Sequence, residues 1–183
     1  MPNDDSLFNE SQTLDLGLKC LDKKDYGGAI AEFNKVLNFN PKNAMAMIKL
    51  GHVYLQQKKY SEAVQQFNRA LEIDPKSLDP YEGLGLCSFE QGLVEDAMEK
   101  FHHVLGVDPD NEHARFGLAL CHQQNEDFDK ALEEFERVLK INPLHCQLHS
   151  NIGTCYYQKD DLKNAVEHFN QALEIDPDDC YAR

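Results

Sequence analysis

The sequence predicts an all-α protein built as a stack of helical hairpins, and three observations lead to this fold class. Prolines recur every 34 residues, small residues recur at fixed places within the same period, and apolar residues inside each period follow helical spacing. A constant period of this length is typical of repeat proteins, in which one unit cannot bury its apolar face alone and stacks on its neighbours.

The prolines set the boundaries of the repeats. Each follows an Asp or an Asn, at Pro41, Pro75, Pro109, Pro143 and Pro177. Counting back from them gives five repeats without insertions or deletions: 10–43, 44–77, 78–111, 112–145 and 146–179. We therefore predict a single domain over 10–179, preceded by a short segment, 1–9. Residues 180–183 read as the start of a possible sixth repeat.

Each repeat is predicted to contain two helices, A and B, of about 12–14 residues, because its apolar positions recur at helical spacing. Position 8 of the repeat carries a small residue, which lets two helices approach closely. Position 20 carries alanine, and position 24 carries a phenylalanine that is expected to wedge between neighbouring hairpins. The phenylalanines are Phe33, Phe67, Phe101, Phe135 and Phe169. The residue before each proline avoids the helical region, so helix B should end there.

The second repeat resembles the tetratricopeptide repeat. The residues that carry the resemblance are Leu50, Gly51, Tyr54, Ala63, Phe67, Ala70 and Pro75. The other repeats match at most of the same positions, so the resemblance covers 10–179. It implies a right-handed superhelical solenoid of antiparallel helix pairs. It also implies a protein-binding function, since in this family the A helices line a concave groove that contacts ligands at positions 2, 5, 6, 9, 12 and 13.

Positions 5, 9 and 12 are unusually apolar in this chain, and acidic side chains lie among them. Their spacing of i, i+4 and i+7 places each set on one helix face. The candidate groove residues are Leu14, Leu18, Leu21, Met45, Ile48, Lys49, His52, Leu55, Asp79, Glu82, Leu86, Phe89, Phe116, Leu120 and Tyr157. The implied ligand is an extended or helical peptide segment with apolar anchors and some Lys or Arg. The alternative is that these side chains complete the packing within the repeats.

The charge balance limits the partners. The net charge is −14, with 18 basic against 32 acidic residues, whereas a nucleic-acid binder depends on Lys and Arg at phosphates. Nucleic acid and anionic membrane surfaces are therefore disfavoured. No stretch approaches the ~18 apolar residues of a membrane helix, and residues 1–9 show no secretion signal. We expect a cytoplasmic protein that does not insert into a membrane.

The sequence predicts no catalytic, cofactor or metal site. Cys87, Cys121 and Cys155 recur at the repeat interval, but stacked helices lie about 8–10 Å apart, too far for equivalent cysteines to pair. They are expected to be small side chains between helices. His145, Cys146 and His149 form a denser group, in which the histidines are expected to lie on the surface. The chain is therefore expected not to be an enzyme.

The leading functional prediction is a scaffold or adaptor that binds peptide segments in the groove. Two other function classes stay open. One is a structural array that self-associates through an uncapped C-terminal repeat, and the other is the substrate-recognition domain of a larger enzyme.

Overall fold

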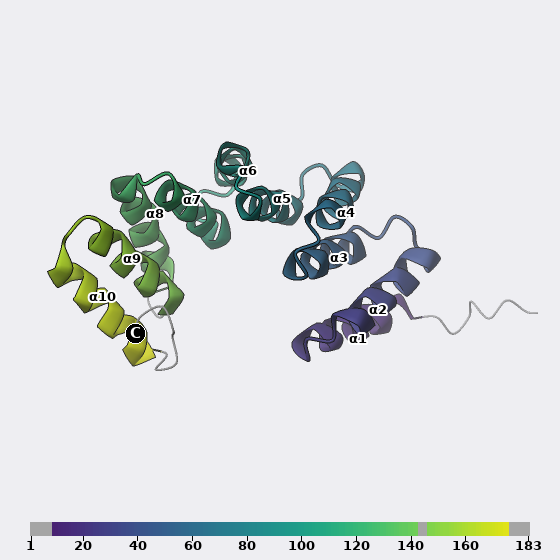
Figure 1. Cartoon of the computed structure of the whole chain (residues 1–183). Helices are drawn as coiled ribbons and strands as arrows, with labels where there is room; N and C mark the ends of the chain where they lie inside the picture. Colours follow the sequence, from purple (N-terminus) through teal and green to yellow (C-terminus); the bar gives the residue numbers. More distant parts are fainter. Residues whose placement is uncertain (1–8, 143–145, 176–183) are drawn as a thin grey trace, which may run out of the picture. The chain divides into compact units, whose positions relative to one another are not determined.

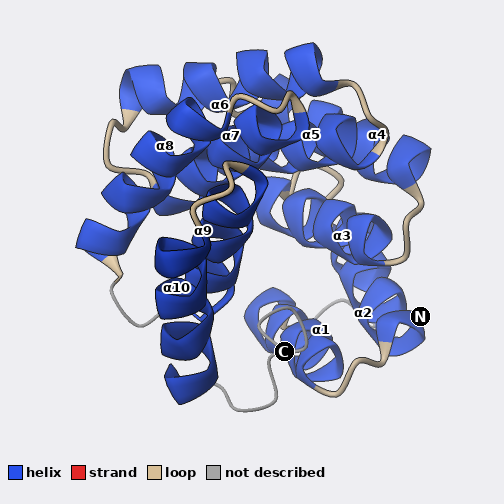
Figure 2. Ribbon diagram, turned by 60° about the vertical axis from the view of Figure 1, so that its left-hand side comes forward, coloured by secondary structure: helices blue, strands red, loops and turns tan. Residues whose placement is uncertain are grey.

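A computed structural model describes residues 9–142 and 146–175, and these residues form ten helices and no strand (Figures 1 and 2). The helices are α1 (Glu10–Asp22), α2 (Tyr26–Phe39), α3 (Ala44–Gln56), α4 (Tyr60–Ile73), α5 (Asp79–Glu90), α6 (Val94–Val107), α7 (Glu112–Gln124), α8 (Phe128–Ile141), α9 (Cys146–Gln158) and α10 (Leu162–Ile175). Each predicted repeat therefore contains one A helix with an odd number and one B helix with an even number. The predicted all-α class of antiparallel helix pairs is confirmed. The segments 1–8 and 180–183 lie outside the described residues.

The chain divides into two compact units, Met1–Cys87 and Ser88–Arg183, here called unit 1 and unit 2. The division falls inside α5, so the third repeat contributes to both units. In unit 1, α1 packs on α2, α2 on α3, and α3 on α4. In unit 2, α6 packs on α7, α7 on α8, α8 on α9, and α9 on α10. Consecutive helices therefore supply most of the packing within each unit, as expected for a repeat protein.

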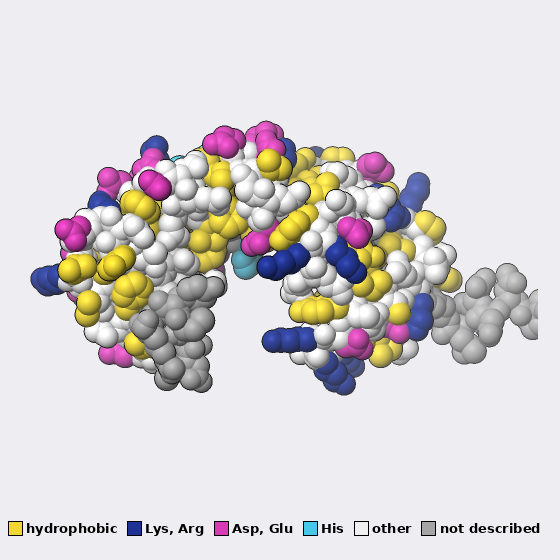
Figure 3. Space-filling model, viewed as in Figure 1, with side chains coloured by type: hydrophobic (Ala, Val, Ile, Leu, Met, Phe, Trp, Pro, Cys, Tyr) yellow, Lys and Arg dark blue, Asp and Glu magenta, His cyan; other side chains and the backbone are white. Residues whose placement is uncertain are grey.

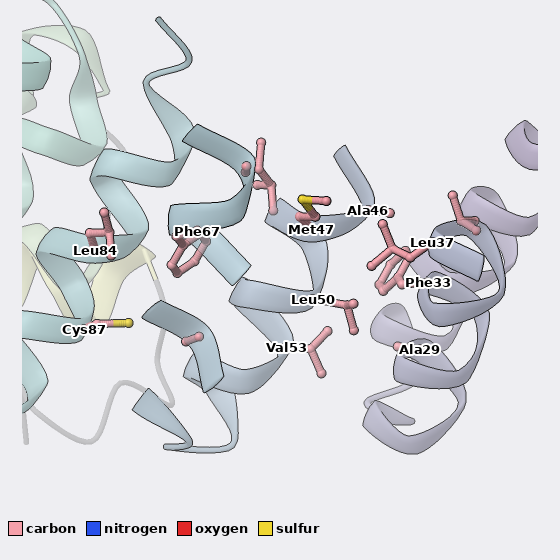
Figure 4. Close-up of a cluster of buried hydrophobic side chains, with 14 residues drawn as sticks. Ala29, Phe33, Leu37, Ala46, Met47, Leu50, Val53, Phe67, Leu84 and Cys87 are labelled. Atoms are coloured by element: carbon pink, nitrogen blue, oxygen red, sulfur yellow. The ribbon is translucent and has the colours of Figure 1, made fainter. Parts of the chain in front are cut away.

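The phenylalanine at position 24 lies at the centre of the packing. Phe33, Phe67 and Phe135 are completely buried, and Phe101 is 1% exposed. In unit 1, Phe67 on α4 lies between Gly51 of its own repeat and Gly83 of the next, where an added Cβ would overlap its ring. Figure 4 shows this core, with Phe33 and Phe67 among the buried aliphatic side chains. Burying one such ring stabilises the fold by about 1.5–3 kcal/mol.

The turn between the repeats follows the predicted proline rule. Asn40, Asp74 and Asp108, each preceding a proline, have φ angles of −126°, −130° and −124° and end their B helices. The next A helix then begins after an asparagine cap in two of the repeats. Asn43 Oδ1 accepts a hydrogen bond from the Ala46 amide at 2.8 Å, and Asn111 Oδ1 accepts one from the Ala114 amide at 2.9 Å. These bonds satisfy amide groups that an uncapped helix would leave unpaired.

The turn within each repeat has one recurrent backbone conformation. Position 15 has a positive φ in all five repeats: Lys24, Lys58, Gly92, Glu126 and Asp160 have φ angles of 57°, 58°, 76°, 59° and 61°. Only the third repeat places a glycine there, although this region disfavours other residues. The shared turn brings the end of each A helix beside the start of its B helix.

Candidate functional site

In unit 1, the first A helix presents part of the predicted groove. Leu18 on α1 is 38% exposed, whereas Leu14 and Leu21 are half-buried and pack against the core. The three side chains share one face, as their spacing predicts. Leu18 is therefore the one of the three that offers the most apolar surface to a ligand.

On the second A helix, the predicted groove residues differ in exposure. Met45 on α3 is 49% exposed, but Ile48 is only 4% exposed and belongs to the core. Ile48 therefore packs within the core and does not offer its side chain to a ligand. Lys49 is half-buried. The half-buried His52 ring meets the Phe67 ring edge to face, with centroids 5.2 Å apart, and Leu55 packs partly against the core.

The predicted residues of α5 lie in both units. In unit 1, Asp79 is exposed, and Glu82 and Leu86 are half-buried. In unit 2, Phe89 is half-buried. Asp79 and Glu82 stand in the first turn of α5, where the partial positive charge of the helix N-terminus stabilises carboxylates.

In unit 2, two predicted residues of α7 support the core and one residue of α9 is exposed. Phe116 and Leu120 pack partly against the core, and the Phe116 ring lies 5.7 Å from the Phe135 ring, centroid to centroid. Tyr157 on α9 is 59% exposed.

Unit 2 also contains a pocket between its fourth and fifth repeats that sequence reasoning missed. The pocket has a volume of about 430 Å³. It is lined by Gln123, Gln124, Glu126, Phe128, Thr154 and Gln158. Carboxamide and hydroxyl groups supply both donors and acceptors, and Phe128 adds an apolar wall. The pocket is therefore suited to polar groups with an apolar neighbour.

A signal for this pocket was present in the sequence. Gln123, Gln124, Thr154 and Gln158 occupy positions 12, 13, 9 and 13 of their repeats, which are ligand-contacting positions in the family that the chain resembles. These side chains are polar and uncharged, so the apolar and charged residues that predict the groove do not include them. Gln158 and Thr154 come from α9, whereas Gln123 and Gln124 come from α7.

An ion pair connects the two repeats beside the pocket. Lys159, next to Gln158, donates to the carboxylate of Asp129, the neighbour of Phe128. This hydrogen bond is the main cause that raises the pKa of Lys159 above its usual value. Because both groups are solvent-accessible, the pair contributes little to the stability of the fold.

The three cysteines of the repeat column are buried, as predicted, and are free thiols. Burial raises the pKa of the Cys121 thiol to about 12 and that of the Cys155 thiol to about 11. Both therefore stay protonated near neutral pH, and a protonated thiol is a poor nucleophile and metal ligand.

The prediction that His149 lies on the surface is wrong. Its side chain is 5% exposed, and its Nδ1 lies 3.1 Å from Nδ1 of His168 on the facing helix α10. The sequence did not indicate this partner. His145 and the side chain of Cys146 lie outside the described residues. Within 9–142 and 146–175, no three His, Cys, Asp or Glu side chains are grouped to hold a metal ion.

None of the helices in the described ranges combines the length and the apolar character required to cross a membrane.

Family models match much of the chain. A model described as "TPR repeat" matches the chain twice, at residues 17–58 and 51–92, and a model described as "Tetratricopeptide repeat" matches residues 114–178. A search of curated proteins finds no match.

Many solved structures are similar. The chain is 27% identical to the MamA protein, with a TM-score of 0.69 and 92% of each chain covered. It is 24% identical to YrrB, described as "a TPR protein with an unusual peptide-binding site", with a TM-score of 0.66 over 95% of this chain and 90% of YrrB. It is 20% identical to TTC0263, a thermophilic TPR protein of Thermus thermophilus, with a TM-score of 0.81 over 96% of this chain and 95% of TTC0263. The last two similarities bear on the fold alone.

Proposed function

Because the chain belongs to the tetratricopeptide repeat family, we propose that it is a non-catalytic scaffold that binds peptide segments of other proteins along its A helices. Repeats of this family typically mediate protein–protein interaction and are typically non-catalytic. The peptide-binding site described for YrrB belongs to that protein, and the ligand class proposed here rests on the family and on the residues of this chain.

The pocket of unit 2 is the observation that carries the proposal. Two successive A helices converge on it, with Gln123 and Gln124 from α7 and Thr154 and Gln158 from α9. An extended peptide exposes an amide donor and a carbonyl acceptor in nearly every residue, and carboxamides can pair with both. Tyr157, on the same helix as Gln158, offers an exposed aromatic surface for an apolar anchor.

The apolar residues of unit 1 supply a second contact region. Leu18 and Met45 are exposed large hydrophobic side chains at ligand-contacting positions of α1 and α3. In the proposal they bind apolar side chains of the ligand, and the negative charge of the protein favours ligands with Lys or Arg. The buried thiols are compatible with a reducing compartment, so the proposal places this function in the cytoplasm.

A selection from a displayed library of random peptides, each about a dozen residues long, tests the proposal. We expect the selected peptides to contain Lys or Arg together with apolar residues. Each peptide is then synthesised, and its affinity for the whole chain is measured by fluorescence anisotropy. Truncating both pocket amides, Gln123→Ala with Gln158→Ala, should weaken binding about tenfold, equivalent to about 1.4 kcal/mol, because the peptide loses hydrogen bonds.

Two controls make the outcome decisive. The variant Val107→Glu changes an exposed apolar residue at the end of α6, away from the ligand-contacting positions, and should leave the affinity unchanged. Circular dichroism confirms that each variant is folded. A selection without binders, or peptides that bind the pocket variant as tightly as the original chain, would reject the proposed function.

A further inference from the structure

The pocket of unit 2 has one negatively charged side chain among the described residues that line it. This side chain is Glu126, in the turn that follows α7, and the other lining side chains are neutral: Gln123, Gln124, Phe128, Thr154 and Gln158. Within 9–142 and 146–175, neither a hydrogen bond nor an ion pair engages the Glu126 carboxylate. The pocket therefore offers a carboxylate that a ligand can bind without displacing another partner.

The two carboxylates that follow Glu126 in the sequence already have partners. An Asp127 oxygen lies 2.7 Å from the Lys130 ammonium nitrogen. Asp129 accepts a hydrogen bond from Lys159. Each lysine offsets the charge of its own partner, whereas the charge of Glu126 is offset by no lysine or arginine of the described ranges. A positively charged group of a ligand can supply the missing partner.

The backbone of Glu126 is held at the end of α7. Its amide donates a hydrogen bond to the Gln123 carbonyl at 3.1 Å, within the turn in which Glu126 has a φ of 59°. Because this turn fixes the start of the side chain, less conformational freedom is lost when a ligand binds. In unit 1 the same position of the repeat holds Lys24 and Lys58. A carboxylate at this turn therefore distinguishes the pocket of unit 2 from the turns of unit 1.

The neutral lining side chains favour a ligand group that donates hydrogen bonds. The Thr154 hydroxyl donates to the Ser150 carbonyl at 2.9 Å, so its oxygen can only accept from a ligand. The carboxamide oxygens of the three glutamines are further acceptors. A guanidinium has five N–H donors and no acceptor, and its flat face can stack on an aromatic ring such as that of Phe128. An ammonium group has three donors and no flat face.

We propose that the pocket of unit 2 binds an arginine side chain of the peptide ligand and that Glu126 selects this side chain. This inference rests on the proposed function, because it names the group of the bound peptide that enters the pocket. The guanidinium donates to the Glu126 carboxylate and to carboxamide oxygens, and its flat face lies on the Phe128 ring. The volume of about 430 Å³ is in the lower part of the range of ligand pockets, roughly 300–1,000 Å³, and suits one long side chain.

A set of three peptides tests the proposal. The first is the tightest selected peptide whose binding depends on the pocket amides, that is, one weakened by Gln123→Ala with Gln158→Ala. In the other two, its arginine is replaced by citrulline, which keeps the shape but is neutral, or by lysine. Affinities for the whole chain are measured by fluorescence anisotropy. We expect citrulline to weaken binding about tenfold, because the charged contact is lost, and lysine to weaken it about threefold.

The variant Glu126→Gln locates the contact, because it keeps the size of the side chain and removes its charge. It should bind the arginine peptide about tenfold more weakly than the original chain does, and it should bind the arginine and citrulline peptides within about twofold of each other. Glu126 is exposed, so the variant is expected to stay folded, as circular dichroism will verify.

A matched control separates this contact from the overall charge. Figure 3 shows acidic side chains, in magenta, on the surface over α6 and α8 of unit 2, and such groups attract any cationic peptide. Glu174→Gln removes the same charge from an exposed residue of α10 that does not line the pocket. It should leave both the affinity and the preference for arginine unchanged.

The outcomes distinguish this proposal from the proposed function. Peptides that bind through the pocket amides but contain no arginine would overturn the arginine site and leave the proposed function standing. The same conclusion would follow if the preference for arginine over citrulline survived in Glu126→Gln, or if Glu174→Gln reduced it equally. A selection without any binder would reject both proposals.

Discussion

At Gly83 the packing leaves no space for a side chain, because the ring of Phe67 occupies the place of a Cβ. Phe67 is completely buried and also contacts Gly51 on its other side, so its ring cannot move away without disturbing the core. We expect Gly83→Ala to lower the free energy of unfolding by about 1–3 kcal/mol, as overpacking does. Urea denaturation followed by circular dichroism measures the change.

Gly106 provides the matched control. It lies near the end of α6, and an added Cβ would have no atom within 4 Å. Because alanine favours a helix over glycine, Gly106→Ala should raise the free energy of unfolding by up to about 1 kcal/mol. If both substitutions changed stability in the same direction, contact with Phe67 would not explain the glycine at position 83.

The hairpin of α9 and α10 contains an element that should respond to pH. His149 and His168 face each other across the two helices, with ring centroids 5.4 Å apart, and the Tyr156 ring stacks on His168 at 5.6 Å. Burial, and then the neighbouring His149, lower the pKa of His168, while Glu167 and Glu136 act in the opposite direction. The two Nδ1 atoms lie 3.1 Å apart, so the pair can share one hydrogen bond.

This lowered pKa fixes the sign of the pH dependence. Below about pH 6.5 the unfolded chain binds a proton that the folded His168 resists, so the free energy of unfolding should fall as the pH falls through this range. Urea denaturation above and below this pH, at about pH 7.5 and about pH 5.5, measures the loss. His168→Phe removes the titrating ring and should lose less stability over the same interval. Equal losses in the two proteins would show that the histidine pair does not contribute.

At the scale of the whole molecule, the excess of acidic residues should make stability depend on salt. With a net charge of −14, the folded chain repels itself, and its ion pairs are mostly solvent-accessible and contribute little. Raising the KCl concentration from about 20 mM to about 500 mM shortens the screening length severalfold. We expect the thermal unfolding midpoint to rise by a few degrees, as measured by circular dichroism.

A variant with a less negative charge checks the cause. Glu72→Lys with Glu174→Lys changes two exposed residues in the last turns of α4 and α10, where positive charge also suits the helix C-terminus. Its midpoint should respond less to salt. A midpoint that falls with salt in the original chain would mean that ion pairs outweigh the repulsion.

The candidate site was only partly predictable from the sequence. The positions that are expected to face a ligand follow from the repeat register of the family, and Leu18, Met45 and Tyr157 at those positions are exposed. Whether they contact a ligand stays a prediction. Ile48 occupies one of the same positions but is buried, because exposure also depends on the helix that packs against a side chain. The pocket is lined mostly by polar residues, so an apolar pattern in the sequence does not indicate it.

The sequence by itself determined the repeats, the ten described helices with their turns, and the phenylalanine and cysteine columns, which are buried except for the half-buried Phe169. Helical spacing and proline geometry are local, and similar units with neighbours on both sides bury most of the same positions. Only the tertiary structure decided that His149 meets His168, 19 residues away, and that residues of α7, α8 and α9 line one pocket. It also decided that Glu126 lines this pocket, whereas Asp127 and Asp129 pair with lysines. The physical reason is that burial is a property of neighbouring elements, whereas periodicity reports only which residues share a face.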